Sequence, residues 1–145
     1  MRAQQARCLI GVIGGLLAVI AMGCGDGLEP TPIEACADDQ EVIVSVSSNP
    51  TPVFAWTPAC GMASLQVLPS NGNPTSGWAL YTGSSGAPNP LRSRIRYGDA
   101  PPEALEPAPA TELEPGTEYT ITVYRWVGDS ESGALIPHGA ATFLR

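Results

Sequence analysis

The chain has 145 residues, of which 14 are acidic and seven are arginine, and it contains no lysine. Its formal net charge of −7 leaves no basic footprint of the kind that phosphate backbones require. We therefore expect no nucleic-acid partner, and we interpret the acidity as a source of solubility.

The first 23 residues have the composition of a secretory signal. Arg2 and Arg7 supply a positive flank, and an uncharged run of 15 residues follows from Leu9 to Gly23, ending in small side chains. An uncleaved membrane anchor is the alternative, but a membrane span needs about 20 mostly apolar residues. The pattern predicts a signal peptide over residues 1–23.

The end of this run, "IAMGC", resembles the lipobox of bacterial lipoproteins. In that family the cysteine is acylated and becomes the mature N-terminus, and here the matching residue is Cys24. The sequence departs from the family pattern at Ala21, where leucine is preferred. The alternative is that an ordinary signal peptidase cleaves the same bond, before Cys24. The resemblance implies a lipid anchor on Cys24, with a membrane as partner.

Cysteine spacing predicts one disulfide. Once Cys8 leaves with the signal and Cys24 is acylated, Cys36 and Cys60 remain as a pair. The strand-like runs at 41–46 and 52–56 flank the turn signal "SSNPT". If they pair about Ser48, residues whose numbers sum to about 96 face each other, as 36 and 60 do. The alternative, a two-cysteine metal site, has no histidine nearby, so we expect no metal and no cofactor.

Removal of residues 1–23 leaves 145 − 23 = 122 residues, enough for one domain. This mature chain has five arginines against 14 acids, a formal charge of 5 − 14 = −9. Residues 25–35 are polar and contain proline without hydrophobic periodicity, so we expect the acylated cysteine and a flexible tether over 24–39. The folded domain is predicted over 40–145.

Short apolar runs alternate with turn residues across the predicted domain, and no run has helical periodicity. Proline-rich residues 98–116 exclude a central strand but allow a brief edge strand near 104–106. The expected class is all-β, an antiparallel sandwich of about seven strands. The runs lie at 41–46, 52–56, 64–68, 77–82, 94–98, 118–126 and 140–144.

The stretch "LEPGTEYTITV", residues 113–123, resembles the corner before the sixth strand of fibronectin type III domains, which have an immunoglobulin-like fold. "VFAWTP" resembles their second strand, with Trp56 buried, and "ATFLR" their last strand. The resemblance covers residues 40–145, apart from the segment 69–112, which follows no pattern of that family. From the residues themselves, Tyr119 should pack inward and return its hydroxyl to the corner backbone. The predicted corner consists of Leu113, Pro115, Gly116 and Tyr119.

Strand alternation predicts a candidate binding surface. If Tyr119 faces the core, Tyr124 and Trp126 face the opposite side of their sheet. Trp78 and Tyr81 on another strand are candidates to join them, in a patch for a protein or carbohydrate partner. The alternative is that a loop covers Trp126 or that a bulge turns it inward.

Enzymatic interpretations have weaker support. His138 occupies a predicted turn, with no nucleophile motif nearby. Asp38, Asp39 and Glu41 are grouped but lack the spacing of a calcium loop. We therefore expect a non-catalytic binding or structural module, and the alternative is a small secreted hydrolase or ligand-processing accessory that uses carboxylates and His138.

The combination of a lipobox with a small sandwich that contains "WTPAC" and "RYG" is similar to uncharacterised envelope lipoproteins of environmental Gram-negative bacteria. The resemblance implies a location in the cell envelope, lipid-anchored in the outer membrane on its periplasmic or surface face.

Overall fold

The structure is a computed structural model, and it describes residues 34–71, 77–83, 89–129 and 131–145. The predicted signal peptide and Cys24 lie outside these residues. Within the described residues there are eight strands and no helix, and so no helix that is long and apolar enough to cross a membrane.

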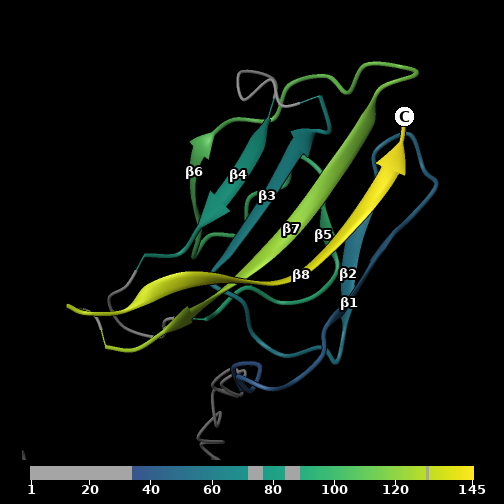
Figure 1. Cartoon of the computed structure of the whole chain (residues 1–145). Coiled ribbons are helices and arrows are strands. Elements are labelled where there is room, and N and C mark those ends of the chain that lie inside the picture. The colour runs from purple at the N-terminus through teal and green to yellow at the C-terminus, as the bar shows by residue number, and fades with distance from the viewer. Residues whose placement is uncertain (1–33, 72–76, 84–88, 130) are drawn as a thin grey trace, which may run out of the picture. The chain divides into compact units, whose positions relative to one another are not determined.

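The eight strands form two antiparallel sheets that lie face to face (Figure 1). The three-stranded sheet has the order β1-β2-β5 and the five-stranded sheet the order β6-β4-β3-β7-β8. In chain order the strands are β1 (Ile43–Val46), β2 (Val53–Thr57), β3 (Ser64–Pro69), β4 (Trp78–Tyr81), β5 (Ile95–Arg96), β6 (Leu105–Ala108), β7 (Glu118–Val127) and β8 (Ala134–Leu144).

The predicted all-β antiparallel sandwich is confirmed, with eight strands instead of about seven. Each of the seven apolar runs contains a strand, and the eighth is β6, in the proline-rich segment. This strand lies at the edge of its sheet, where one side of the strand forms no ladder hydrogen bonds. Pro107, which has no N–H to donate, is therefore tolerated there. The last strand begins at Ala134 instead of residue 140, because pairing with the long strand β7 recruits residues of low strand propensity.

The core lies between the two sheets and is rich in aromatic side chains. Phe54 contacts Trp78 and Tyr97, with ring centroids 6.3 Å apart in both pairs. Trp56 is buried, as predicted, and its indole N–H donates to the carbonyl of Cys60 at 2.8 Å. Full burial of each such side chain contributes on the order of 1.5–3 kcal/mol, so these rings dominate the energy that holds the sheets together.

The predicted disulfide between Cys36 and Cys60 is present, but the predicted hairpin register is wrong. Val44 pairs with Trp56, so residue numbers across the β1–β2 hairpin sum to 44 + 56 = 100, not 96. Cys36 reaches Cys60 by another route, a parallel bridge between Ala35 and Gly61 beside the hairpin. The shift arises because the β1–β2 connection is centred two residues later than Ser48.

The predicted tether boundary at residue 39 is also wrong. Cys36 is fully buried, and the N–H of Gly61 donates to the carbonyl of Glu34 at 2.7 Å. A turn follows, in which the N–H of Gln40 donates to the carbonyl of Ala37 at 3.2 Å and directs the chain into β1. Residues 34–39 are therefore part of the folded domain, fixed to it by the disulfide.

The tyrosine corner has the predicted geometry. Tyr119 is buried, and the N–H of Glu114 donates to its hydroxyl oxygen at 2.9 Å. Pro115 and Gly116 form the turn, in which the N–H of Thr117 donates to the Glu114 carbonyl at 3.2 Å. Gly116 has φ +78°, which glycine adopts without a Cβ clash, and Leu113 is buried beneath the corner.

Candidate functional site

The candidate site is the outer face of the five-stranded sheet, the side turned away from β1, β2 and β5. One row of side chains crosses all five strands on this face, since Tyr81 pairs with Leu105 and Ser64 pairs with both Tyr81 and Tyr124. Pro137 completes the row opposite Tyr124. The short side chain of Ser64 thus lies between two tyrosines that come from neighbouring strands.

The structure corrects one predicted member of this surface. Trp78 is fully buried and faces the core, where its ring centroid lies 5.1 Å from that of Tyr97. Its indole N–H donates to the Glu106 carboxylate at 2.7 Å. Because successive side chains of a strand alternate between faces, Trp78 and Tyr81, three positions apart, cannot share one face.

Trp126 lies on the outer face next to Leu135, its partner on β8, and is half-buried. Its indole N–H donates to the carbonyl of Asp129 at 3.1 Å. Its ring covers Gly133, where an added Cβ would lie 2.4 Å from the indole nitrogen. The turn between β7 and β8 therefore covers part of Trp126 but does not take it into the core.

A second set of bonds fixes the backbone of Trp126. The N–H of Trp126 donates to the side-chain oxygen of Asn89 at 2.8 Å, and the Asn89 amide donates to the Trp126 carbonyl at 3.2 Å. Asn89 is itself buried. The asparagine thus pairs with this edge of β7 as a neighbouring strand would, which holds the ring at a defined position.

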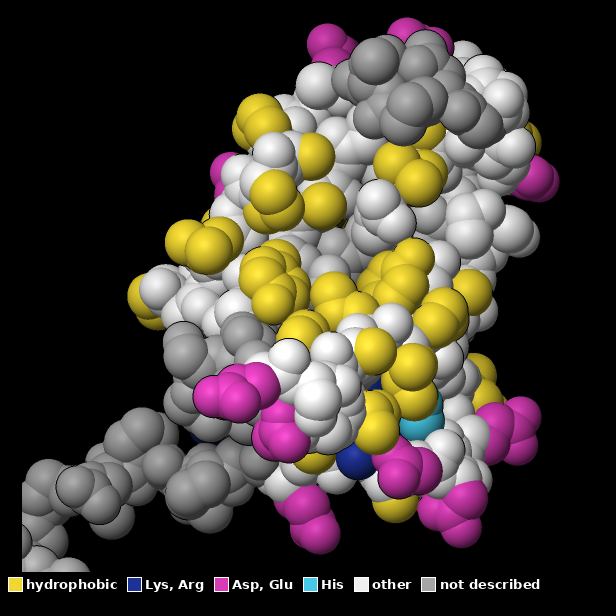
Figure 2. Space-filling model, turned by 60° about the vertical axis from the view of Figure 1, so that its left-hand side comes forward, with side chains coloured by type: hydrophobic (Ala, Val, Ile, Leu, Met, Phe, Trp, Pro, Cys, Tyr) yellow, Lys and Arg dark blue, Asp and Glu magenta, His cyan; other side chains and the backbone are white. Residues whose placement is uncertain are grey.

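We call Tyr81, Leu105, Tyr124, Trp126 and Leu135 the aromatic face. Tyr81, Tyr124 and Trp126 are half-buried, whereas Leu105 is 66% exposed and Leu135 is 37% exposed. Figure 2 shows hydrophobic side chains gathered across the middle of one side of the molecule, with acidic side chains at its lower margin and its top. A water-exposed apolar surface with a charged rim is typical of a binding surface.

Two members of the aromatic face are absent from the sequence prediction. Leu105 lies in a proline-rich segment for which the sequence predicts only a short edge strand. Leu135 lies in a segment that the sequence predicts to be a turn, and the structure places both residues in strands. Both positions follow from pairing, because Tyr81 aligns Leu105 and Trp126 aligns Leu135. Strand alternation applied to β7 alone could not have found them.

His138 lies within β8 instead of the predicted turn. Val123 pairs with Gly139 and Tyr124 with Pro137, so His138 is the extra residue of a β-bulge. Its Nε2 atom is buried and has no hydrogen-bond partner among the described residues. A histidine base acts through a hydrogen bond to a nucleophile, and the described residues show none at this nitrogen.

One of the acidic residues before β1 makes a structural contact. Asp38 forms an ion pair with Arg125 of β7, whose side chain is only 15% exposed. This contact joins the segment after Cys36 to the five-stranded sheet. Among the described residues, no group of three or more histidine, cysteine and acidic side chains is arranged to hold a metal ion.

Asp129 organises the turn that covers Trp126. Its carboxylate accepts hydrogen bonds from the N–H and hydroxyl of Ser132, at 2.7 and 2.9 Å, and from the N–H of Glu131 at 2.9 Å. These bonds, that from the Ser132 backbone above all, lower the pKa of Asp129. The carboxylate therefore stays ionised in the turn that supports one edge of the aromatic face.

Comparison of the chain with known protein families, curated proteins and solved structures gives no match. Any functional conclusion therefore depends on the residues and geometry described above.

Proposed function

We propose that the chain is a non-catalytic, lipid-anchored protein of the cell envelope whose β-sandwich binds a protein or carbohydrate partner through the aromatic face. The observation that carries this proposal is the row of side chains that runs across the outer face of the five-stranded sheet from Leu105 through Tyr81 and Tyr124. The core already holds Trp56 and Trp78, so folding does not require further aromatic rings on the outer face. Tyrosine and tryptophan supply large contact areas with little loss of side-chain entropy, which favours binding.

The envelope location is supported by the sequence of the first 24 residues. The positive flank, the uncharged run and the "AMGC" motif together favour export and acylation at Cys24. The disulfide between Cys36 and Cys60 agrees with an oxidising compartment outside the cytoplasm. Several acyl chains on Cys24 would fix the protein to a membrane, at about 0.8 kcal/mol for each buried methylene.

A fibronectin type III-like identity is part of the same proposal. It is supported by the hydrogen bond between Glu114 and Tyr119 and by the buried Trp56 on the second strand. It is also supported by β7, which follows the tyrosine corner and pairs with the last strand, β8. Domains of this kind often act as adhesion modules or spacers, which agrees with a binding role.

Capture of partners from solubilised envelopes tests the proposal. The full chain carrying Leu105→Ser should retain less partner than the wild type, because the exposed leucine contributes to the contact and little to the core. Ile43→Ser is the matched control, since Ile43 is 64% exposed on the other sheet. Equal capture by all three proteins would contradict a role for the aromatic face.

A further inference from the structure

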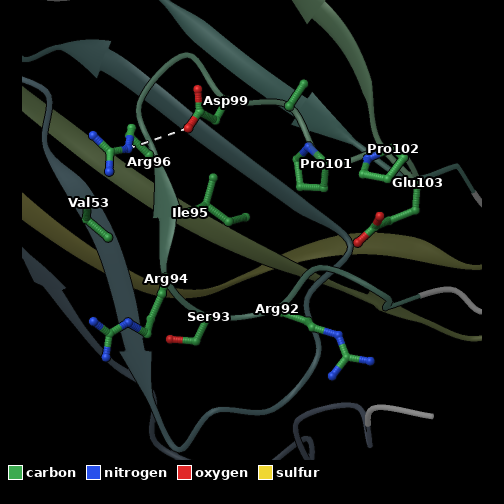
Figure 3. Close-up of a pocket in the computed structure, with 11 residues that line it drawn as sticks. Val53, Arg92, Ser93, Arg94, Ile95, Arg96, Asp99, Pro101, Pro102 and Glu103 are labelled. Atoms are coloured by element: carbon green, nitrogen blue, oxygen red, sulfur yellow. Dashed lines mark ion pairs between the residues drawn. The ribbon is translucent and has the colours of Figure 1, made fainter. Parts of the chain in front are cut away.

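Three of the five arginines that follow residue 23 line one open cavity. Arg92, Arg94 and Arg96 lie at alternate positions before and within β5, on the opposite sheet from the aromatic face. The cavity has a volume of about 540 Å³, in the range of small-molecule sites. Figure 3 shows Arg94 and Arg96 extending to the same side beside Val53, and Pro101, Pro102 and Glu103 lie beyond Ile95 on the other side.

The backbone at Arg94 has an unusual conformation. Its φ is +79°, the only positive φ of a non-glycine residue in the described part of the chain. Such a conformation disfavours any side chain, and glycine adopts it freely. A long charged side chain at this position therefore indicates a role for that side chain, since folding alone would favour glycine.

The neighbouring serine explains how this conformation arises. Phe54 pairs with Ile95, and the same register would place Trp56 opposite Ser93. Instead, the Ser93 hydroxyl accepts from the Trp56 N–H at 2.8 Å and donates to the Trp56 carbonyl at 3.0 Å. The hydroxyl replaces both ladder bonds, so the chain leaves β2 at Ser93 and turns through Arg94 before it rejoins at Ile95.

The two arginines next to Val53 differ in their partners. The Nε atom of Arg96 lies 3.5 Å from a carboxylate oxygen of Asp99, so this guanidinium already holds a carboxylate from the chain. The Arg94 guanidinium has no hydrogen-bond or ion-pair partner among the described residues. A planar guanidinium in this position is suited to take one carboxylate through two parallel hydrogen bonds.

The other lining residues limit the ligand further. Asp99 and Glu103 also line the cavity, and Asp99 pairs with Arg96, so Arg94 offers a single guanidinium to a ligand. One guanidinium suits a monoanion better than a dianion. Ile95, Val53 and the proline rings of Pro101 and Pro102 add apolar surface, which suits a non-polar group attached to the anion.

The negative charge of the whole mature chain does not oppose such binding strongly. At physiological ionic strength the screening length is about 8 Å, so charges that line the cavity outweigh those on distant surfaces. The guanidinium of Arg94, which lines the cavity, therefore acts on an entering anion more strongly than the distant acidic residues do.

We propose that this cavity binds a carboxylate monoanion with an apolar body, and that Arg94 is its anchoring residue. A free organic acid and the C-terminal carboxylate of a peptide both have this chemistry. The site is independent of the aromatic face, because it lies on the other sheet and requires neither a membrane nor a partner protein.

Equilibrium dialysis of the full chain in detergent micelles tests the proposal, with protein-free micelles as a blank. The probes are N-acetyl-leucinate, which resembles a peptide C-terminus, and 4-methylpentanoate, a free organic acid. N-acetyl-leucinamide has the same body without the carboxylate, and inorganic phosphate is a different oxyanion. We expect the wild type to bind at least one carboxylate tenfold more tightly than the amide. The carboxylate that binds more tightly shows whether the site prefers a peptide C-terminus or a free organic acid.

Variants separate binding from folding. Arg94→Gly should lose at least tenfold in carboxylate affinity, whereas its urea midpoint should equal or exceed that of the wild type, since glycine relieves the positive φ. Arg94→Lys keeps the charge but loses the planar pair of donors, so its affinity should fall severalfold. Asp99→Asn should bind the carboxylate more tightly, because it releases Arg96.

Three results would overturn the proposal. The first is equal binding of N-acetyl-leucinate, 4-methylpentanoate and N-acetyl-leucinamide by the wild type. The second is full carboxylate affinity in a folded Arg94→Gly protein. The third is binding of phosphate more tightly than either carboxylate, which would mark a general anion site.

Discussion

The hydroxyl oxygen of Tyr119 accepts a hydrogen bond from the backbone N–H of Glu114, five residues earlier, at 2.9 Å. The ring itself stacks on Phe143 of β8, with centroids 5.6 Å apart and an interplanar angle of 22°. One side chain thus joins the corner before β7 to the last strand. The hydrogen bond and the ring contact contribute separately to the free energy of unfolding, so two variants can measure each one.

Tyr119→Phe removes the hydroxyl and keeps the ring. We expect a loss of about 1 kcal/mol in the free energy of unfolding, from one partly buried hydrogen bond. Tyr119→Ala also removes the ring and should cost about 3–5 kcal/mol through the cavity it leaves. Urea unfolding of both variants measures the two contributions, and equal losses would contradict the separation.

Trp126→Ala should be less damaging than Tyr119→Ala, because Trp126 is half-buried on the outer face and Tyr119 is buried in the core. The expected loss is smaller than that of Tyr119→Ala, since part of the Trp126 side chain stays in contact with water in the folded protein. The same urea experiment measures it. A loss as large as that of Tyr119→Ala would mean that Trp126 belongs to the core.

Reduction of the disulfide between Cys36 and Cys60 should destabilise the domain. The bond closes a loop with a sequence separation of 24 residues, which corresponds to about 3 kcal/mol in the chain-entropy description. Thermal unfolding with and without reductant should therefore show a lower Tm for the reduced protein. The double variant Cys36→Ser/Cys60→Ser is the control, and its Tm should not respond to reductant.

Acid should loosen the turn between β7 and β8. Because folding lowers the pKa of Asp129, its stabilising contribution is complete above the ordinary aspartate value of about 3.9 and is lost as the pH falls through the lower folded value. The NMR shift of the Ser132 amide should follow this titration with a midpoint below that ordinary value. In Asp129→Asn this titration should be absent. A midpoint in the wild type above the ordinary aspartate value would contradict the lowered pKa of Asp129.

Cys24→Ser should release the protein from the membrane. The proposed acylation predicts that the wild type enters the detergent phase on phase separation and that the variant stays in the aqueous phase. Mass spectrometry of the wild-type N-terminus should show the acyl chains. Equal partitioning of the two proteins would exclude the lipid anchor.

The sequence predicts the parts of this fold that depend on local pattern. The seven apolar runs and the tyrosine corner follow from residue alternation and turn chemistry, which act over a few residues. The disulfide follows from the number of cysteines that remain after residue 24. The hairpin register does not follow from the sequence, because the connection after β1 has several turn residues, any of which could be its centre. Trp78 and Tyr81 are three positions apart on β4, so alternation places them on opposite faces, and only Tyr81 lies on the outer face.

The arginine cavity could be predicted only in part. Alternation of Arg92, Arg94 and Arg96 is visible in the sequence and indicates one shared face, but only Arg94 and Arg96 extend to the same side (Figure 3). The positive φ of Arg94 depends on the Ser93 hydroxyl, which replaces the ladder bonds of Trp56 on another strand. Such a contact between segments 37 residues apart has no local signature.

Site-specific photo-crosslinking in intact cells tests the central claim most directly. A photoreactive amino acid placed at Leu105, 66% exposed on the aromatic face, should give a discrete crosslinked product in the envelope fraction. The same group at Ile43, 64% exposed on the opposite sheet, should give none. A product at Leu105 alone is the result we predict, whereas products at both positions, at Ile43 alone or at neither would contradict binding through the aromatic face.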